Sequence, residues 1–257
     1  LRSGVETALV ELGTGFLRHP ENLALREALK DGWLSKEDYF RQLLRLVYRV
    51  LFLFVAEDRD ALHPEGTPLD VRERYARFYS TDRLRDLASR TLGGAHADLW
   101  QQLGLVLRGV WEGEPALGLP ALGSGLFDPK ELPNLSGATI ANRYLLAALR
   151  ALGELTEGKR TLRISYRNLG AQELGSVYEG LLELHPTLHV DAGTFELASA
   201  AGHERKTTGS YYTPSSLVDC LLDTALDPVL DAATEGKPAA EAEHALLALR
   251  VVDPACG

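Results

Sequence analysis

The longest helical pattern in the chain lies between residues 36 and 59. Apolar side chains recur there every three or four positions, which is the spacing of a helix with a broad buried face. These positions are Phe40, Leu43, Leu44, Val47, Leu51, Phe54 and Val55. Leu46, Val50 and Leu53 lie on the other side. We therefore expect the central, buried helix of a bundle, with Ser35 and Asp38 forming its N-terminal cap.

Shorter helical patterns follow at residues 71–79, 82–92 and 97–111, and strand signals are scarce up to this point. Residues 1–112 therefore predict a helical domain. The next segment, 113–137, contains nine Gly or Pro residues, which prevent a long helix or strand. We interpret it as a linker or a long loop.

Residues 138–200 predict a helical connector with a short strand and a hairpin. A helix is expected after Ser136, then a strand at 161–166 and a second helix at 171–184. A turn at 191–193 joins two short strand patterns, which predicts a hairpin with a Gly-containing loop.

Residues 201–257 predict the start of a further domain. Thr213 suits a helix N-cap and Pro214 the first helical position, and an Ala-rich helix is expected at 238–247. Residues 249–252 have the apolar, β-branched pattern of a short strand. The fold class expected for the chain is mainly α: a helical bundle with a few short strands, followed by the truncated start of an α/β domain.

The composition of the chain limits the class of protein and the cellular compartment that we expect. The chain has 45% hydrophobic and 25% charged residues and a net charge of -9, which is typical of a soluble acidic protein. Its longest apolar run, Val50 to Ala56, is too short to span a membrane, and its start does not resemble a secretory signal. Only Cys220 and Cys256 are present, so we expect a reducing, cytoplasmic setting. Because Met is absent and the chain ends in a turn after an apolar run, we interpret it as an internal piece of a longer protein.

Two segments carry candidate chemistry. In Asp253-Pro254-Ala255-Cys256-Gly257 an acidic residue ends a predicted strand and a Gly turn follows, as in nucleotide sites of α/β domains. A surface turn explains it equally well. Gly209-Ser210-Tyr211-Tyr212-Thr213-Pro214 leads into a helix and offers a ring to a flat ligand. One core and one surface tyrosine at a helix entry would explain this segment too.

Together, in this order, the two segments resemble the G-x-Y-Y-T-P and D-P-A-C-G motifs of adenine-specific DNA methyltransferases. The wider chain is similar to the helical region of large restriction-modification methylases of the Eco57I-like type, in segments 52–59 and 174–182. The resemblance implies a Rossmann-like domain that binds S-adenosylmethionine. The implied cofactor-binding residues are Tyr211, Tyr212, Thr213, Pro214, Asp253, Pro254, Ala255, Cys256 and Gly257.

The chain also departs from that family. The Asn-Pro-Pro-aromatic motif, which holds the extruded adenine, does not occur, and the glycine loop of the family continues beyond Gly257. We therefore assign no catalytic residue and expect the chain alone to be inactive. Its partners would be DNA, through the parent enzyme, and the remainder of the same polypeptide.

The net charge disfavours a general polyanion binder. Two arginine groups, 41/45/49 and 83/85/90, lie at helical positions, and we expect both to be solvated faces. His203, Arg205 and Lys206 precede the tyrosine motif, so they are the candidates for contact with DNA phosphates.

Other chemistry has weaker support. The histidines lack metal-ligand spacing, no P-loop sequence is present, and we predict no metal site. Glu157-Gly158-Lys159 and Glu235-Gly236-Lys237 match a nuclease E-x-K pattern but do not follow apolar strands, so we interpret them as loops. A non-catalytic helical scaffold or interaction module is the main alternative to a methyltransferase fragment.

Overall fold

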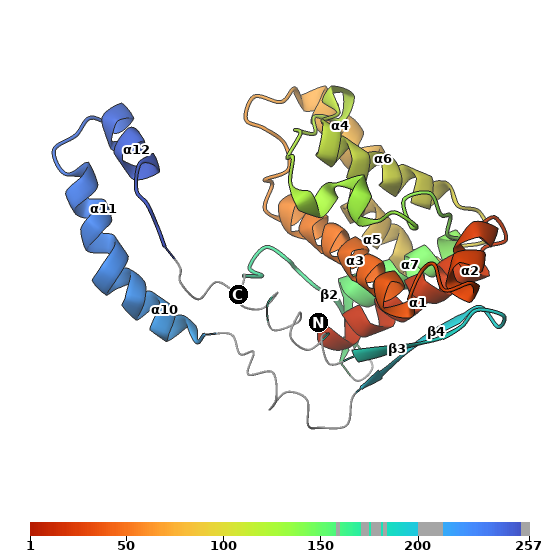
Figure 1. Cartoon of the computed structure of the whole chain (residues 1–257). Helices are drawn as coiled ribbons and strands as arrows, with labels where there is room; N and C mark the ends of the chain where they lie inside the picture. Colours follow the sequence, from red (N-terminus) through yellow and green to blue (C-terminus); the bar gives the residue numbers. More distant parts are fainter. Residues whose placement is uncertain (158–159, 171–174, 176–180, 182–183, 200–212, 253–257) are drawn as a thin grey trace. The chain divides into compact units, whose positions relative to one another are not determined.

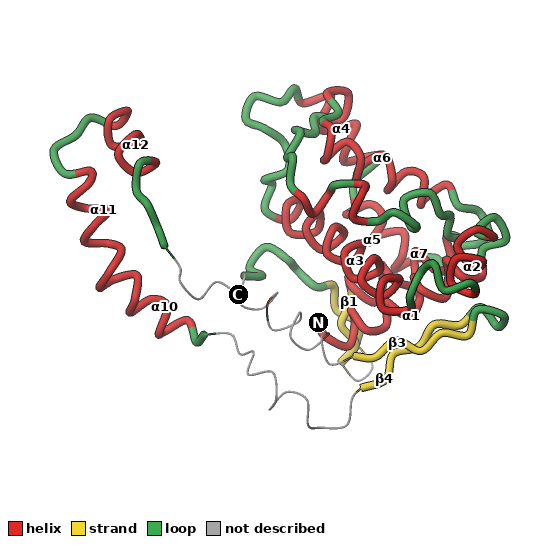
Figure 2. Tube along the Cα trace, viewed as in Figure 1, coloured by secondary structure: helices red, strands yellow, loops and turns green. Residues whose placement is uncertain are grey.

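The computed structural model describes residues 1–157, 160–170, 175, 181, 184–199 and 213–252, and it divides the chain into two compact units, 1–209 and 210–257. The described residues are mainly helical and contain two small antiparallel sheets (Figures 1 and 2). The mainly α class predicted from the sequence is confirmed. The described part contains no parallel sheet, so the α/β domain expected after residue 200 stays a prediction.

Seven α-helices precede the first strand. They are α1 (Arg2–Arg18), α2 (Leu23–Lys30), α3 (Lys36–Asp58), α4 (Leu69–Phe78), α5 (Thr81–Arg90), α6 (Asp98–Glu112) and α7 (Asn142–Gly153). Between α6 and α7 lie three 3-10 turns, η1 (Pro115–Leu117), η2 (Gly125–Phe127) and η3 (Pro129–Glu131). The strands are β1 (Glu154–Glu157), β2 (Arg160–Arg163), β3 (Leu184–His189) and β4 (Thr194–Ser199).

Helix α3 is buried at the centre of the first unit, as its pattern predicts. Tyr39, Leu43 and Phe54 are completely buried, and the Tyr39 hydroxyl donates to the Gly13 carbonyl at 2.7 Å. The Ser35 hydroxyl accepts a hydrogen bond from the Asp38 N–H at 3.0 Å, which confirms the predicted cap. Residues 1–110, all of them described, form helices and connecting turns without a strand.

Helix α1 packs closely against α7 because glycines lie at the contact. A Cβ at Gly15 would lie 2.6 Å from Cβ of Tyr144 and 2.7 Å from Cδ1 of Ile140. Real Cβ atoms do not approach one another this closely, so any side chain at position 15 would push the two segments apart.

Gly15→Ala is therefore expected to lower the free energy of unfolding by about 1 to 3 kcal/mol, although alanine is the better helix former. Gly104→Ala on α6 is the matched control, because a Cβ there meets nothing within 4 Å. It should stabilise the protein by about 0.5 to 1 kcal/mol. Urea unfolding followed by circular dichroism measures both values, and equal effects would contradict the close α1–α7 contact.

Residues 113–137 form a long loop that packs on the first unit through buried side chains such as Phe127 and Leu135. Arg49 of α3 holds the loop in place. Its Nε and Nη2 donate to the carbonyls of Leu126 and Asp128, both at 2.7 Å. Helix α7 starts at Asn142, later than the Ser136 start suggested by the sequence, because residues 138–141 run across the core and Ile140 is completely buried.

The two arginine groups, 41/45/49 and 83/85/90, are less exposed than the sequence analysis expects. Arg49 and Arg85 are each only 4% exposed, so the prediction that both groups form solvated faces is wrong for these two residues. The reason is that each guanidinium has partners inside the protein: loop carbonyls for Arg49, and the Asp58 carboxylate for Arg85. Arg41 and Arg90 are exposed and pair with acids on their own helices, as expected for a solvated face.

The predicted hairpin is confirmed. Strands β3 and β4 pair antiparallel in a register that joins His189 to Thr194 and Leu184 to Ser199. Gly193 has φ 60°, a left-handed conformation that favours glycine in the turn. Phe195 is buried against the rings of Tyr39 and Phe40, so this hairpin completes the core around α1 and α3.

The strand expected at 161–166 is shorter than predicted: β2 ends at Arg163 and pairs with β1. The next residue, Ile164, donates its N–H to the Gly153 carbonyl, and Tyr166 is buried in the core. Most of the helix expected at 171–184 lies outside the described residues. Segment 174–182, for which the sequence analysis expects a resemblance to the methylase family, is described only at Gly175 and Leu181.

The second unit contains α10 (Ser215–Leu221), the π-helical turn η4 (Leu222–Leu226), α11 (Asp227–Thr234) and α12 (Ala239–Leu247). Helices α11 and α12 pack side by side (Figure 1). Pro214 is the N-cap and Ser215 the first helical residue, one position later than predicted. Residues 249–252 are not a strand, because they have no pairing partner in the described part of the chain and Val251 and Val252 are each 82% exposed.

No helix among the described residues is long and apolar enough to cross a membrane.

Candidate functional site

Of the cofactor-binding residues predicted from the sequence, the structure describes Thr213 and Pro214. Both are exposed and directly precede α10, and the Pro214 carbonyl accepts the first helical hydrogen bond, from the Leu217 N–H at 2.9 Å. The others lie outside the described residues: Tyr211, Tyr212, Asp253, Pro254, Ala255, Cys256 and Gly257. The three candidates for DNA contact, His203, Arg205 and Lys206, lie outside them too.

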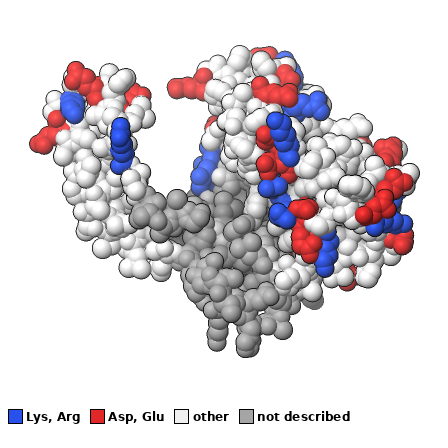
Figure 3. Space-filling view, viewed as in Figure 1, with Lys and Arg blue, Asp and Glu red and all other residues white. Residues whose placement is uncertain are grey.

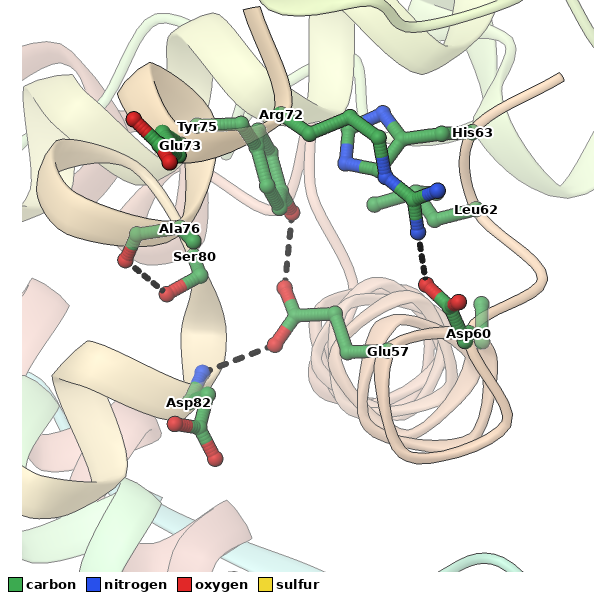
Figure 4. A pocket seen from close by; sticks show the side chains of 11 residues that line it. Glu57, Asp60, Leu62, His63, Arg72, Glu73, Tyr75, Ala76, Ser80 and Asp82 are labelled. Carbon is green, nitrogen blue, oxygen red and sulfur yellow. Dashed lines mark hydrogen bonds and ion pairs between the residues drawn. The ribbon is translucent and has the colours of Figure 1, made fainter. Parts of the chain in front are cut away.

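The clearest polar site of the described residues is a pocket where α3 ends against α4 and the start of α5 (Figure 4). It has a volume of about 320 Å³. Glu57 lies at its base, while Asp60, His63 and Arg72 lie toward its other side.

Glu57 accepts four hydrogen bonds. The donors are the Tyr75 hydroxyl at 2.6 Å, the Thr81 N–H at 2.8 Å, the Thr81 hydroxyl at 2.7 Å and the Asp82 N–H at 2.7 Å. Two of these donors are backbone N–H groups in the first turn of α5, where no carbonyl of the helix is available to accept from them. A carboxylate at this position also meets the positive end of the helix dipole. Glu57 therefore joins the end of α3 to the start of α5.

Burial raises the pKa of Glu57 above its usual range, and the bonds from Thr81, Tyr75 and Asp82 oppose this only in part. Burial and the neighbouring Glu57 also raise the pKa of Tyr75. All four of these contacts to Glu57 are made by donors, which use the acceptor capacity of a carboxylate. It has no free lone pair with which to bind a ligand, so we interpret Glu57 as a structural anchor.

Asp60, His63 and Arg72 of the pocket also have partners within the protein. Arg72 pairs with Asp60, and Nδ1 of His63 lies 3.0 Å from the Gly118 carbonyl. The His63 ring contacts the Tyr75 ring edge to face at 5.0 Å. In the described part of the chain, no group of three or more His, Cys, Asp or Glu could hold a metal ion.

The residues next to Glu57 make similar anchors. Asp58 binds Arg85 of α5 at 2.5 Å and accepts the Tyr166 N–H at 2.8 Å. Arg59 donates to the carbonyls of Arg167 and Leu169, both at 2.9 Å. Segment 52–59, for which the sequence analysis expects a resemblance to the methylase family, is thus the point where α3, α5 and residues 166–169 are joined.

Charges of both signs are interspersed over the visible face of the first unit (Figure 3). Many belong to exposed ion pairs, for example Arg45 with Glu131 and Arg163 with Asp86, both at 2.8 Å. Such pairs contribute little to stability. On this face the structure gives no broad basic patch of the kind that nonspecific DNA binding needs.

Comparisons with protein-family models, with curated proteins and with solved structures gave no match.

Sequence reasoning missed the anchoring roles of Glu57, Asp58 and Arg85. A usable signal was present: three consecutive charged residues, Glu57, Asp58 and Arg59, directly follow the longest apolar run of the chain. Charges that end a buried helix must find partners as the chain leaves the core. The partners themselves, 18 or more residues away in sequence, could not be identified from spacing alone.

Proposed function

We propose that this chain belongs to an adenine-specific DNA methyltransferase of the restriction-modification type. In that enzyme it supplies a helical connector and part of the S-adenosylmethionine site. The observation that carries the proposal is the order of the two motifs: Gly209 to Pro214, then a helical hairpin, then Asp253 to Gly257. Both motifs border the helices α10 to α12 of one compact unit, which supports a common site.

In this proposal the residues have distinct roles. The Asp253 carboxylate accepts a charge-assisted hydrogen bond from the ammonium of the cofactor's methionine part. Gly257 allows the backbone to approach the ligand, and Tyr211 or Tyr212 offers a ring surface to the adenine. His203, Arg205 and Lys206 contact DNA phosphates ahead of the tyrosine motif. The chain contributes no residue that holds the target adenine.

A non-catalytic helical interaction module is the second candidate. It is favoured by the apolar side chains exposed on the second unit, with Leu217 61%, Leu221 64% and Leu247 78% exposed. Such a surface marks a contact with another chain segment or protein. A module of this kind would not bind S-adenosylmethionine.

Photocrosslinking separates the two functions. Tritium-labelled S-adenosylmethionine is irradiated with the natural polypeptide that carries this sequence, and the tryptic peptides are mapped. Trypsin cuts after Lys206 and Arg250 but not at Lys237, which Pro238 follows, so the two motifs fall in different peptides. We expect label in the peptides that start at Thr207 and Val251, and none with excess S-adenosylhomocysteine. Label confined to other peptides, or no specific label, would overturn the proposal.

The 257-residue chain assayed alone is expected to transfer no methyl groups, because it lacks the Asn-Pro-Pro-aromatic motif of the proposed family. The assay is transfer of labelled methyl groups to unmethylated DNA, with an adenine methyltransferase of established activity as the positive control. Incorporation above the level of a protein-free sample would show that the adenine-holding group has been assigned wrongly.

A further inference from the structure

A second cavity of the first unit lies between α6, the turns η2 and η3, and residues 136–139. Its volume is about 550 Å³, which is within the range of small-molecule sites. Apolar side chains line much of it, among them Trp100, Leu107 and Phe127. The Trp100 indole N–H is already bonded to the Ala138 carbonyl at 2.7 Å, so this ring is fixed and presents an aromatic surface.

Arg49 lines the same cavity and is only 4% exposed. Its Nε and Nη2 bind two carbonyls, but it forms no ion pair with a carboxylate in the described part of the chain, and Nη1 has no hydrogen bond there. The nearest acids have other partners: Asp128 accepts the Lys130 N–H and Glu131 pairs with Arg45. Burial lowers the pKa of Arg49 to about 10, with Asp128 and Glu131 opposing the shift, so the group is a cation at neutral pH.

A buried cation without a directly bound anion is costly, and an incoming anion would reduce that cost. Arg108 of α6 adds a second positive charge where it lines the cavity, and no ion pair engages it in the described residues. Gly104, one turn before Arg108 on the same helix, leaves room for a ligand, since a Cβ there would meet nothing within 4 Å.

We propose that this cavity binds a small aromatic anion, with the ring system against Trp100 and the exposed side chain of Leu105 and the anionic group facing Arg49 and Arg108. The Trp100 ring and the leucine side chain favour a flat apolar body, and the two guanidinium groups select a carboxylate, sulfonate or phosphate on it. This binding is independent of the proposed methyltransferase role.

The test uses a matched pair of dyes: 8-anilinonaphthalene-1-sulfonate, and N-phenyl-1-naphthylamine, which lacks the sulfonate. The full chain carries Trp33→Phe and Trp111→Phe, so energy transfer from Trp100, the remaining tryptophan, reports dye bound near the cavity. Loss of this signal in the Gly104→Leu variant assigns it to the cavity and not to the exposed apolar side chains of α10 to α12, which that substitution leaves unchanged. Circular dichroism of each variant verifies that it is folded.

We expect one saturable site for the sulfonate dye and weaker binding of the neutral dye. Gly104→Leu fills the space and should weaken the binding of both dyes by about tenfold or more. Arg108→Gln should weaken only the anionic dye, by about threefold for a partly exposed charge. Gly94→Leu and the 76% exposed Arg90→Gln are controls outside the cavity and should change neither value.

Three results would overturn the proposal. The first is the absence of energy transfer from Trp100 to the sulfonate dye. The second is equal affinity of the folded Gly104→Leu variant and its parent for that dye. The third is equal affinity of the two dyes together with no effect of Arg108→Gln, which would leave an apolar pocket without anion selectivity.

Discussion

Arg85→Ala is expected to lower the free energy of unfolding by about 3 to 5 kcal/mol, because it leaves Asp58 without its buried partner. The Arg85 side chain is 2% exposed, and Nη2 lies 2.5 Å from Oδ1 of Asp58. Its guanidinium carbon also lies 4.5 Å from the centre of the Phe54 ring. The substitution therefore removes an ion pair, a cation-π contact and packing at the same point. Chemical denaturation of the two proteins measures the difference in their free energies of unfolding.

Arg90→Ala is the matched control on the same helix. Arg90 is 76% exposed and pairs with Asp86 at 3.5 Å, so its loss should change stability by less than about 1 kcal/mol. Equal effects of the two substitutions would show that Arg85 is not a buried anchor in solution.

The effect of Arg85→Ala should depend on pH. Burial alone raises the pKa of Asp58, but the Arg85 and Tyr166 hydrogen bonds and the nearby arginine charges outweigh it, so the pKa lies below its usual range. In the unchanged protein this carboxylate stabilises the fold at neutral pH, and that contribution is lost as pH falls through the lowered pKa. Without Arg85 two of the causes that lower the pKa of Asp58 are lost, so this pKa rises and protonation relieves the unpaired charge at a higher pH. The stability difference between the two proteins should therefore shrink from pH 7 toward pH 4, whereas a constant difference would argue against an unpaired Asp58.

Local patterns explain how much of this fold the sequence predicted. The helical period of residues 36–59 and the Ser35 cap depend on neighbours within four positions, so spacing alone was enough for α3. The β3–β4 hairpin was also predicted from a local signal. Its two strand patterns and the turn at Gly193 that joins them are adjacent in sequence.

Contacts between distant segments explain what was missed. Arg49 has the spacing of an exposed stripe on α3, and only the return of the chain at Leu126 and Asp128 buries it. Residues 249–252 have strand propensity, but a strand also needs a pairing partner, and the described residues provide none. The cavity at Trp100 and Arg49 was missed because α3, α6 and the long loop, which are distant in sequence, form it together.

The predicted cofactor site leads to the second large effect. In the methyltransferase to which we propose this chain belongs, Asp253→Ala should weaken S-adenosylmethionine binding by about ten- to over a hundredfold. This corresponds to the loss of a charge-assisted hydrogen bond worth about 1.5 to 3 kcal/mol. Tyr212→Ala should cost less, because a ring surface is replaced by solvent and no charge is left unpaired. Calorimetric titration of the three proteins measures the affinities.

Asp231→Ala is the control for this experiment, since Asp231 is an exposed carboxylate of α11 in the same unit and outside both motifs. It removes the same charge without touching the proposed pocket, so its affinity should equal that of the unchanged enzyme. If Asp253→Ala and Asp231→Ala both keep the affinity of the unchanged enzyme for S-adenosylmethionine, the turn after residue 252 is not part of the cofactor site. A loss shared by both substitutions would instead indicate a general effect of charge on the unit, because only a local contact distinguishes one carboxylate from the other.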